Sequence, residues 1–564
     1  MRWKNKISLL LPLLLLQVHL IAQSKETAPT GSLTGIREKI ILSTDRSVYF
    51  AGEPLLFKAN CFVPGLTNIP LSTVLYLELY DQQLKPVLQQ KEQIINGISA
   101  GSIEIPSYSI SGNYYLRAYT LYMRNFPKEF FYTSELTIIN PELPSKEAFQ
   151  TIRKNNQPEE ADTSIGIKTS QEIYAPRSLI TIDLTGNEKV NLSVSVVKKG
   201  SYQKEKAGMN TYFKADRSAD TAIQLMTYPE IRPLSISGKV IDAKNSQALK
   251  GVLVYVSIKE KNKQFHVTRT KADGTFMVSL PNVNESQQVY ICTQKQTDLE
   301  TKVLINNDFA TAFISPAYIP EIIDSAKISL INEMYMNQQV TTAFNNSIPT
   351  SKKFLPPLPD PFDEDSKITF MKDYIALNSM TEILDEIVAY TKVKKKKNQP
   401  YIEVSDRIHK EVMPQALILL DNVPFHDHTQ LLSLSPSSIL SVAVIAEPYV
   451  YGGEVLNGIV NIKSVNGDFG GLELPKDVSV VEYITYNPEQ TVSFEKFQKK
   501  ADAQNKAPDF RNTLYWNPNV VLENGKQSLK FYSADHVSYY EIIVKGMNNK
   551  GELIFKTKTI RVAK

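Results

Sequence analysis

The sequence predicts a mainly β protein, built as serial β-sandwich domains with one small α+β module. Tyr and Phe are frequent, with 28 and 23 residues, and aromatic side chains favour the pleated surface of a sheet. The stretch Thr73–Tyr80 places Leu75, Leu77 and Leu79 on one face, which is the period of a half-buried antiparallel strand. Asp273-Gly274 stands between two short apolar runs, which is a strong hairpin signal. At 564 residues the chain is long enough for several such domains.

The N-terminus predicts a secretory signal peptide over residues 1–22. Basic residues precede an apolar core from Ile7 to Leu16, and the small Ala22 follows. The apolar run is too short to span a membrane, so we expect export, with the mature chain beginning at Gln23. The expected location is therefore the periplasm, the outer membrane or the cell surface.

The charge balance excludes one class of partner. The chain holds 63 Lys and Arg against 59 Asp and Glu, and the signal peptide carries Arg2, Lys4 and Lys6 but no acid. The mature chain therefore has 60 basic and 59 acidic side chains. This near-neutral balance argues against nucleic acid as a partner.

Residues 32–141 are expected to form the first sandwich, because turn signals such as Asn96-Gly97 cut the chain into short, similar lengths. Two stretches, DRSVYFAGEPLLFKA (Asp45–Ala59) and GNYYLRAYT (Gly112–Thr120), resemble a macroglobulin-type domain of the alpha-2-macroglobulin superfamily. A polar linker over 142–165 and a second sandwich of the same type over 166–231 are expected to follow.

The two cysteines bear on that resemblance. The alpha-2-macroglobulin superfamily carries a thioester in a Cys-Gly-Glu-Gln motif, whereas here Cys61 precedes Phe62 and Cys292 precedes Thr293. The resemblance therefore implies the fold without a covalent trap. We expect both cysteines to be unpaired, buried core residues of separate domains, and a long-range disulfide is the alternative.

Residues 232–300 are expected to form a third sandwich, with Val252, Val254, Val256 and Ile258 pointing inward. The string GKVIDA, then LKGVLVYV and ADGTF, resembles the carboxypeptidase regulatory-like domain, a small seven-stranded sandwich without catalytic residues. A connector over 301–365 follows, whose Pro-rich end favours an extended backbone.

Residues 366–475 are the expected α+β module. Its centre, Gln415–Lys463, reads as three short strands joined by structured turns, and a capping box at Ser379–Glu382 predicts a helix. LILLDNVP, YVYGG and NGIVNIK resemble the plug domain of TonB-dependent outer-membrane receptors, with Asn422 at the position of the usual turn glycine. Only 101 residues follow Lys463, too few for a receptor barrel, so we expect a plug-like module without a barrel. Residues 476–564 are expected to form a separate C-terminal β-domain.

Polar motifs point to no catalytic, metal or cofactor site. His426-Asp427-His428 is a histidine cluster without an evident third ligand, so a polar loop is favoured over zinc. The run Lys392–Lys397 is expected to be a solvated face, with contact to anionic lipid or an acidic partner as the alternative. No nucleophile elbow, zinc-protease helix or phosphate-binding glycine loop occurs in the sequence.

These observations favour a non-enzymatic exported binding and scaffolding protein over an enzyme. We expect the plug-like module to dock onto a separate outer-membrane protein, either a β-barrel or its assembly, with no small-molecule substrate. Tyr449 and Tyr451, beside Gly452-Gly453, form an aromatic turn expected to be exposed, and they are the candidate partner-binding residues. The alternative is a macroglobulin-like protease inhibitor or trap without a thioester.

Overall fold

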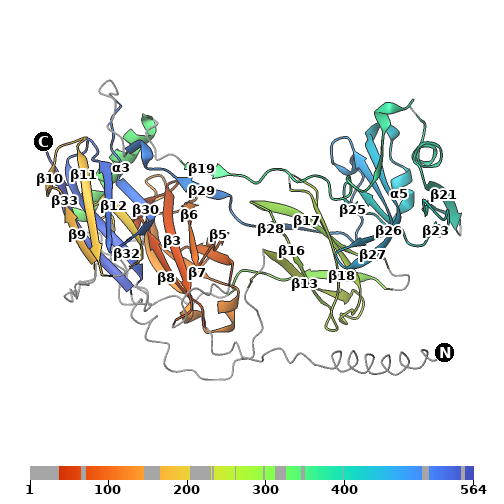
Figure 1. Ribbon diagram of the computed structural model, residues 1–564, viewed down its shortest axis with the longest axis horizontal. Coiled ribbons are helices and arrows are strands. Elements are labelled where there is room, and N and C mark those ends of the chain that lie inside the picture. The colour runs from red at the N-terminus through yellow and green to blue at the C-terminus, as the bar shows by residue number, and fades with distance from the viewer. Residues whose placement is uncertain are drawn as a thin grey trace, which may run out of the picture.

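The protein is mainly β, as predicted, and its sheets are arranged along an elongated molecule (Figure 1). The computed structural model describes residues 37–64, 72–144, 165–187, 189–202, 230–231, 234–260, 262–295, 299–311, 325–344, 350–375, 377–396, 398–497, 507–547 and 553–564. The expected signal peptide and most of the 142–165 linker lie outside these residues. None of the described helices is both long and apolar enough to cross a membrane.

The first sandwich packs a three-stranded sheet on a five-stranded sheet. The sheets are β1 (Lys39–Thr44), β3 (Pro54–Phe62) and β6 (Ile98–Glu104), and β2 (Val48–Phe50), β8 (Tyr132–Ile139), β7 (Gly112–Tyr119), β4 (Val74–Tyr80) and β5 (Pro86–Gln93). Strand β4 was expected to be half-buried, but it is buried along its whole length. Residues 307–310 cover its second face, where the Phe309 ring meets the Tyr76 ring edge-on at 5.5 Å.

The second sandwich is assembled from two segments that lie far apart in the chain, residues 165–198 and 513–562. Its strands are β9 (Ile165–Thr169), β10 (Ile173–Tyr174), β11 (Leu179–Gly186), β12 (Asn191–Lys198), β30 (Thr513–Val521), β31 (Lys526–Tyr532), β32 (Ser538–Met547) and β33 (Leu553–Val562). Strand β12 lies between β30 and β32, and β11 lies between β9 and β31. The ranges 166–231 and 476–564, expected to be separate domains, therefore supply strands to one sandwich.

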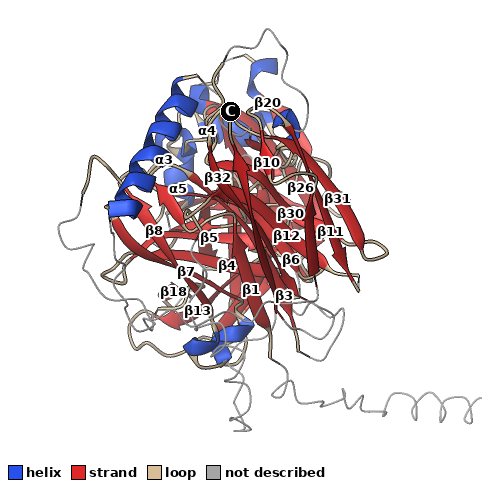
Figure 2. Cartoon of the chain, turned by 90° about the vertical axis from the view of Figure 1, so that its left-hand side faces the viewer, coloured by secondary structure: helices blue, strands red, loops and turns tan. Residues whose placement is uncertain are grey.

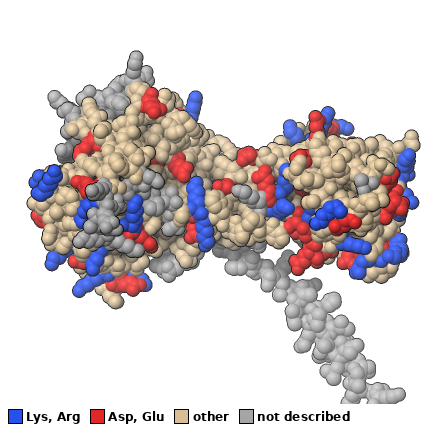
Figure 3. All heavy atoms as spheres, turned by 90° about the horizontal axis from the view of Figure 1, so that it is seen from above, with Lys and Arg blue, Asp and Glu red and all other residues tan. Residues whose placement is uncertain are grey.

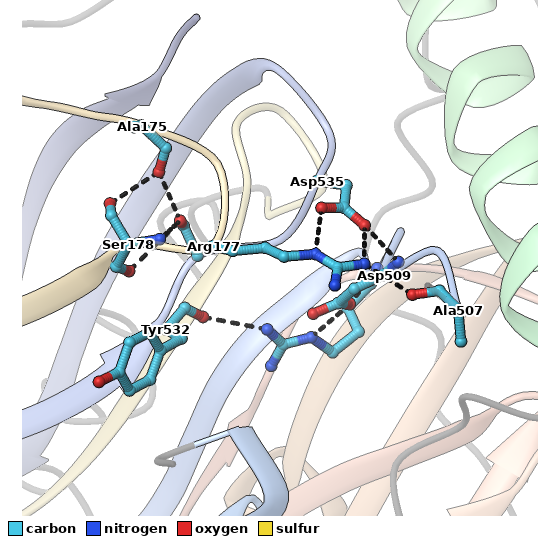
Figure 4. A network of polar contacts seen from close by, with 9 residues as sticks. Ala175, Arg177, Ser178, Ala507, Asp509, Tyr532 and Asp535 are labelled. Atoms are coloured by element: carbon cyan, nitrogen blue, oxygen red, sulfur yellow. Dashed lines mark hydrogen bonds and ion pairs between the residues drawn. The ribbon is translucent and has the colours of Figure 1, made fainter. Parts of the chain in front are cut away.

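A polar clasp joins the two halves of this second sandwich (Figure 4). The Arg177 guanidinium, in the turn before β11, forms two bonds to the Asp535 carboxylate at 2.6 and 2.7 Å, and it donates to the Ala507 carbonyl at 2.7 Å. Asp535 also accepts from the Asp509 amide at 2.8 Å. Burial tends to raise the pKa of Asp535, but these hydrogen bonds outweigh it and hold the pKa below its usual value.

The third sandwich is also discontinuous. Its strands are β13 (Ser235–Asp242), β16 (Thr275–Ser279) and β18 (Thr301–Ile305) in one sheet, and β15 (Gln264–Arg269), β14 (Leu253–Ile258), β17 (Ser286–Thr293) and β28 (Ser479–Ile484) in the other. The inward face of β14 is as predicted, because Val254, Val256 and Ile258 belong to the core of the sandwich, whereas Leu253 and Tyr255 do not. Strands β18 and β28 lie beyond the predicted range of 232–300, and β28 comes from the chain that follows the module.

A buried polar joint connects the first and third sandwiches. The Lys91 ammonium lies 2.7 Å from an oxygen of Asp308 and 4.1 Å from the ring centre of Tyr483. Beside it, Glu92 accepts from the Asn487 amide at 2.7 Å, and burial raises the pKa of Glu92 to about 8. Glu92 is therefore mostly neutral at pH 7, which avoids an unpaired buried charge.

The connector over 301–365, whose Pro-rich end was expected to be extended, contains a helix before that end, α3 (Ser325–Ala343), visible beside the strands in Figure 2. Its Met334 side chain is buried against Val48 and Phe50 of the first sandwich. Its Asn337 donates to Asn512 at 3.0 Å, so the same helix contacts the second sandwich. Strands β19 (Thr350–Lys353) and β29 (Glu489–Val492) then pair as a two-stranded ribbon. In Figure 1 this ribbon lies between the first two sandwiches and the part of the molecule that holds the third sandwich and the module.

The module, residues 367–474, has a five-stranded sheet and a small three-stranded sheet. The strands are β20 (Lys367–Phe370), β26 (Ile439–Tyr451), β27 (Glu454–Ser464), β24 (Leu417–Leu420) and β25 (Val423–Pro424), and β21 (Thr391–Lys396), β22 (Gln399–Ser405) and β23 (Val412–Met413). Short helices α4 (Met380–Glu382) and α5 (His428–Leu432) accompany them. The N-cap of the predicted capping box forms, with Ser379 accepting from the Glu382 amide, whereas the Glu382 carboxylate accepts from the Asn378 amide and not from that of Ser379. Asn422 adopts the expected left-handed backbone with φ of 68°.

The clasp predicts the effect of a substitution on the second sandwich. Replacing Asp535 with Asn removes the ion pair with Arg177, and because the clasp is partly exposed we expect a loss of about 1–2 kcal/mol. The midpoint of chemical denaturation of this sandwich should fall accordingly. Asp183→Asn, an exposed carboxylate on β11, is the matched control and should leave the midpoint nearly unchanged. Equal midpoints for Asp535→Asn and Asp183→Asn would show that the clasp does not stabilise the sandwich.

Candidate interaction site

The module packs its five-stranded sheet against the outer face of the third sandwich, and we call this contact the module–sandwich interface. Its buried apolar residues come from both partners. The sandwich supplies Leu253, Tyr255, Phe265, Val267 and Cys292, the module supplies Leu417, Leu419, Ile445, Leu456 and Ile459, and the connector before the module adds Phe362. The interface is therefore a second apolar core, formed by side chains that alternate with those of the sandwich interior.

The hairpin formed by β26 and β27 extends over strand β15, and it contains the two predicted docking residues. Tyr449 and Tyr451 stack on each other with ring centres 6.0 Å apart. The Tyr451 hydroxyl donates to the Phe265 carbonyl at 2.8 Å, and the Tyr449 hydroxyl donates to Asp365 at 2.6 Å. The exposed aromatic turn that the sequence suggested is thus half-buried, because its rings face the same chain.

The end of this hairpin is held on strand β15 by a close backbone approach and by an ion pair. Gly452 has φ of 59°, and a Cβ added there would lie 2.8 Å from the Val267 carbonyl oxygen. Only glycine allows this approach without a shift of backbone. Beside it the Arg269 guanidinium binds both oxygens of Glu454, at 3.0 and 2.5 Å. Charge, shape and the tyrosine contacts therefore hold the hairpin on β15.

The outward side of the same hairpin is apolar and uncovered. Val450 and Val455 are cross-strand partners, and their exposed fractions are 72% and 59%. They alternate with the tyrosines along the strand, so the inward rings and the outward valines occupy opposite faces. The sequence predicted that Tyr449 and Tyr451 would be exposed here, whereas the more exposed side chains are those of Val450 and Val455.

The histidine cluster serves the packing of the module. His426 lies with Nε2 2.9 Å from the Thr293 carbonyl of the third sandwich, while His428 Nδ1 accepts from the Ile402 amide at 2.9 Å. Between them Asp427 caps helix α5 by accepting from the Thr429 and Gln430 amides. Within the described ranges no group of three His, Cys, Asp or Glu is placed to hold a metal ion.

Both cysteines are free thiols and both are buried, as predicted. Cys61 belongs to the core of the first sandwich, whereas Cys292 points into the module–sandwich interface. Burial raises the pKa of each thiol well above its usual value. Their different positions make them reporters of different parts of the molecule.

Comparison with known proteins gives only distant structural similarity. No protein-family model and no curated protein matches the chain. Trypsin-activated alpha-2-macroglobulin from Escherichia coli aligns with 94% of this chain and 42% of its own length, at 9% identity and a TM-score of 0.24. Salmonella alpha-2-macroglobulin reacted with methylamine aligns with 93% of this chain and 39% of its own, at 8% identity and a TM-score of 0.23. Adhesin InvE of Yersinia pseudotuberculosis aligns with 49% of this chain and 61% of its own, at 11% identity and a TM-score of 0.13. These TM-scores are too low to assign a family.

The partly buried side chain of His428 predicts a pH dependence of the module's stability. Burial, with a smaller effect of His426, lowers the pKa of His428 to about 4, whereas an unfolded chain titrates near 6.5. The unfolded state therefore takes up a proton first as the pH falls, and His428 should cost up to about 3 kcal/mol of stability between pH 6.5 and 4. The midpoint of the module's unfolding should fall over this range, more in the native chain than in His428→Gln.

The Gln variant keeps an acceptor for the Ile402 amide but does not titrate. The carboxylates contribute equally in both proteins, so the difference between the two pH profiles isolates His428. Parallel profiles would contradict the assignment of a neutral imidazole to His428 in the folded module.

Proposed function

We propose that the chain is a non-enzymatic binding and scaffolding protein of the outer-membrane envelope, which presents its module to a separate outer-membrane protein. The observation that carries this proposal is the β26–β27 hairpin, which is held rigidly on one face and leaves Val450 and Val455 uncovered on the other. A pair of adjacent exposed apolar side chains at a fixed position suits a contact with another protein better than isolated surface valines do.

The arrangement of domains supports presentation at a distance. In Figure 1 the second and first sandwiches lie at one end, the third sandwich lies next, and the module occupies the other end. The helix α3 contacts both of the first two sandwiches, and the polar joint and the module–sandwich interface connect the rest. Such a molecule holds its binding hairpin far from the second sandwich without requiring a flexible linker.

The packing of the two predicted docking residues leads us to propose other residues for contact with the partner. Tyr449 and Tyr451 were expected to dock, but their rings contact Phe362 and the β15 strand of the same chain. We assign them a positioning role and assign partner contact to the valine pair. Substituting Tyr451 should therefore loosen the hairpin and lower the thermal midpoint, instead of leaving the melting transition unchanged.

The valine pair can be tested by co-purification from detergent-solubilised outer membranes with the tagged mature chain. Val450→Ser/Val455→Ser should reduce recovery of the outer-membrane partner at least about tenfold, as expected when two buried apolar contacts are lost, with an unchanged thermal midpoint. Val465→Ser/Val537→Ser, which replaces two exposed valines elsewhere, is the control and should retain recovery.

Two results would contradict the proposal. Equal recovery with both double variants would remove the hairpin from the interface. Retention of a broad-specificity protease after the chain has been cleaved would favour the alternative function of a trap without a thioester.

A further inference from the structure

The hairpin of β21 and β22 carries a concentrated run of positive charge. Residues 392–397 are Lys, Val and four further Lys, and Lys394, Lys395 and Lys396 are all exposed. Figure 1 places β21 at the end of the molecule opposite the C-terminus. In Figure 3 several Lys and Arg side chains lie at the edge of that same end.

These lysines have no acidic neighbour across the strand ladder. Lys394 pairs with Tyr401, Lys395 with Pro400, and Lys396 with Gln399. Within the described part of the chain none of these three lysines forms an ion pair, whereas Lys392 stands opposite Glu403. The outer half of the hairpin therefore presents uncompensated charge, and its base does not.

Both faces of this outer half are open. Side chains alternate along a strand, so Lys394 and Lys396 point to one face and Lys395 points to the other. Strand β23 pairs only with Val404 and Ser405 at the base, which leaves the outer residues two-stranded. Asn398, with φ of 66°, turns the chain tightly between the strands. The outer half of the hairpin is therefore a narrow basic projection. No third strand pairs with it to form the side of a groove.

We propose that this projection, Lys394–Lys396, binds the phosphate headgroups of an anionic lipid surface. The ammonium group is a compact charge on a flexible stem, and it pairs with phosphates that have no fixed geometry. A layer of headgroups can surround a projection that is basic on both faces, whereas an extended acidic peptide would contact one face at a time. The inference rests on the proposed envelope location and adds a lipid ligand to the protein partner.

The test is co-sedimentation of the purified mature chain with vesicles. The chain should bind vesicles of phosphatidylcholine mixed with phosphatidylglycerol, bind phosphatidylcholine alone much less, and dissociate as salt is raised. Each lysine near an anionic surface contributes about 1 kcal/mol, so Lys394→Gln/Lys395→Gln/Lys396→Gln should lower the partition constant about 100-fold. The thermal midpoint of this triple variant should match that of the native chain, because all three lysine side chains are exposed.

The control variant removes the same charge from the third sandwich. Lys244→Gln/Lys250→Gln/Lys271→Gln replaces three exposed lysines and should retain most of the vesicle binding. Equal losses with both triple variants, or no binding to the anionic vesicles, would overturn the proposal. Binding of soluble polyglutamate that depends on Lys394–Lys396, without vesicle binding, would assign the projection to an acidic polypeptide instead.

The experiments distinguish failure of the partner site at Val450 and Val455 from failure of the lipid site at Lys394–Lys396. Val450→Ser/Val455→Ser should bind vesicles as the native chain does, because the valines lie on a different hairpin. Loss of the outer-membrane partner in that variant together with normal vesicle binding would support both proposals. Vesicle binding lost only in the lysine variant would support the lipid site whatever the fate of the protein partner.

Discussion

Burial of both faces of the sheet β15-β14-β17-β28 determines where the module lies. Val254 and Ile291 point into the interior of the third sandwich, while Tyr255 and Cys292, the residues that follow them in the chain, point at the module. Fully burying an apolar side chain contributes about 1.5–3 kcal/mol relative to leaving it exposed. With eleven buried apolar residues at the module–sandwich interface, separation of the two partners would expose a large apolar surface to water. The position of the β26–β27 hairpin follows from this contact.

The order of the chain strengthens that constraint. The third sandwich is completed by β28 only after the module, and the second sandwich is completed by β30–β33 only after the third. Each inner unit is thus inserted into an outer one and is joined to it by two chain connections. An inserted unit loses fewer orientations on docking than one tethered at a single end, which lowers the entropic cost of the interface. The module is therefore presented by the rest of the molecule, and its uncovered faces are the ones available to other molecules.

Local sequence patterns predicted the strands, the turns and much of the core, but not which distant segments pair. The inward face of β14, the Asn422 turn and the Ser379 N-cap follow from periodicity and backbone chemistry over a few residues. The pairing of β12 with β30 and β32 joins residues more than 300 positions apart, and no local period identifies such a partner. One signal was present: β14 is apolar on its second face too, through Leu253 and Tyr255, which indicates a sheet covered on both sides. Tyr449 and Tyr451 are partly buried because the module covers this second face of the sheet.

Thiol labelling of Cys292 tests most directly whether the module is docked on the third sandwich. With maleimide under native conditions, Cys292 and Cys61 should both react slowly in the native chain, because both thiols are buried. Phe362, buried between Phe265 and Tyr451, is the side chain to remove. Phe362→Ala should cost about 3 kcal/mol at the interface and accelerate labelling of Cys292 about 100-fold, while Cys61 stays slow as the internal reference. Rapid labelling of Cys292 in the native chain, or equal rates in the native chain and Phe362→Ala, would contradict a module held against the third sandwich.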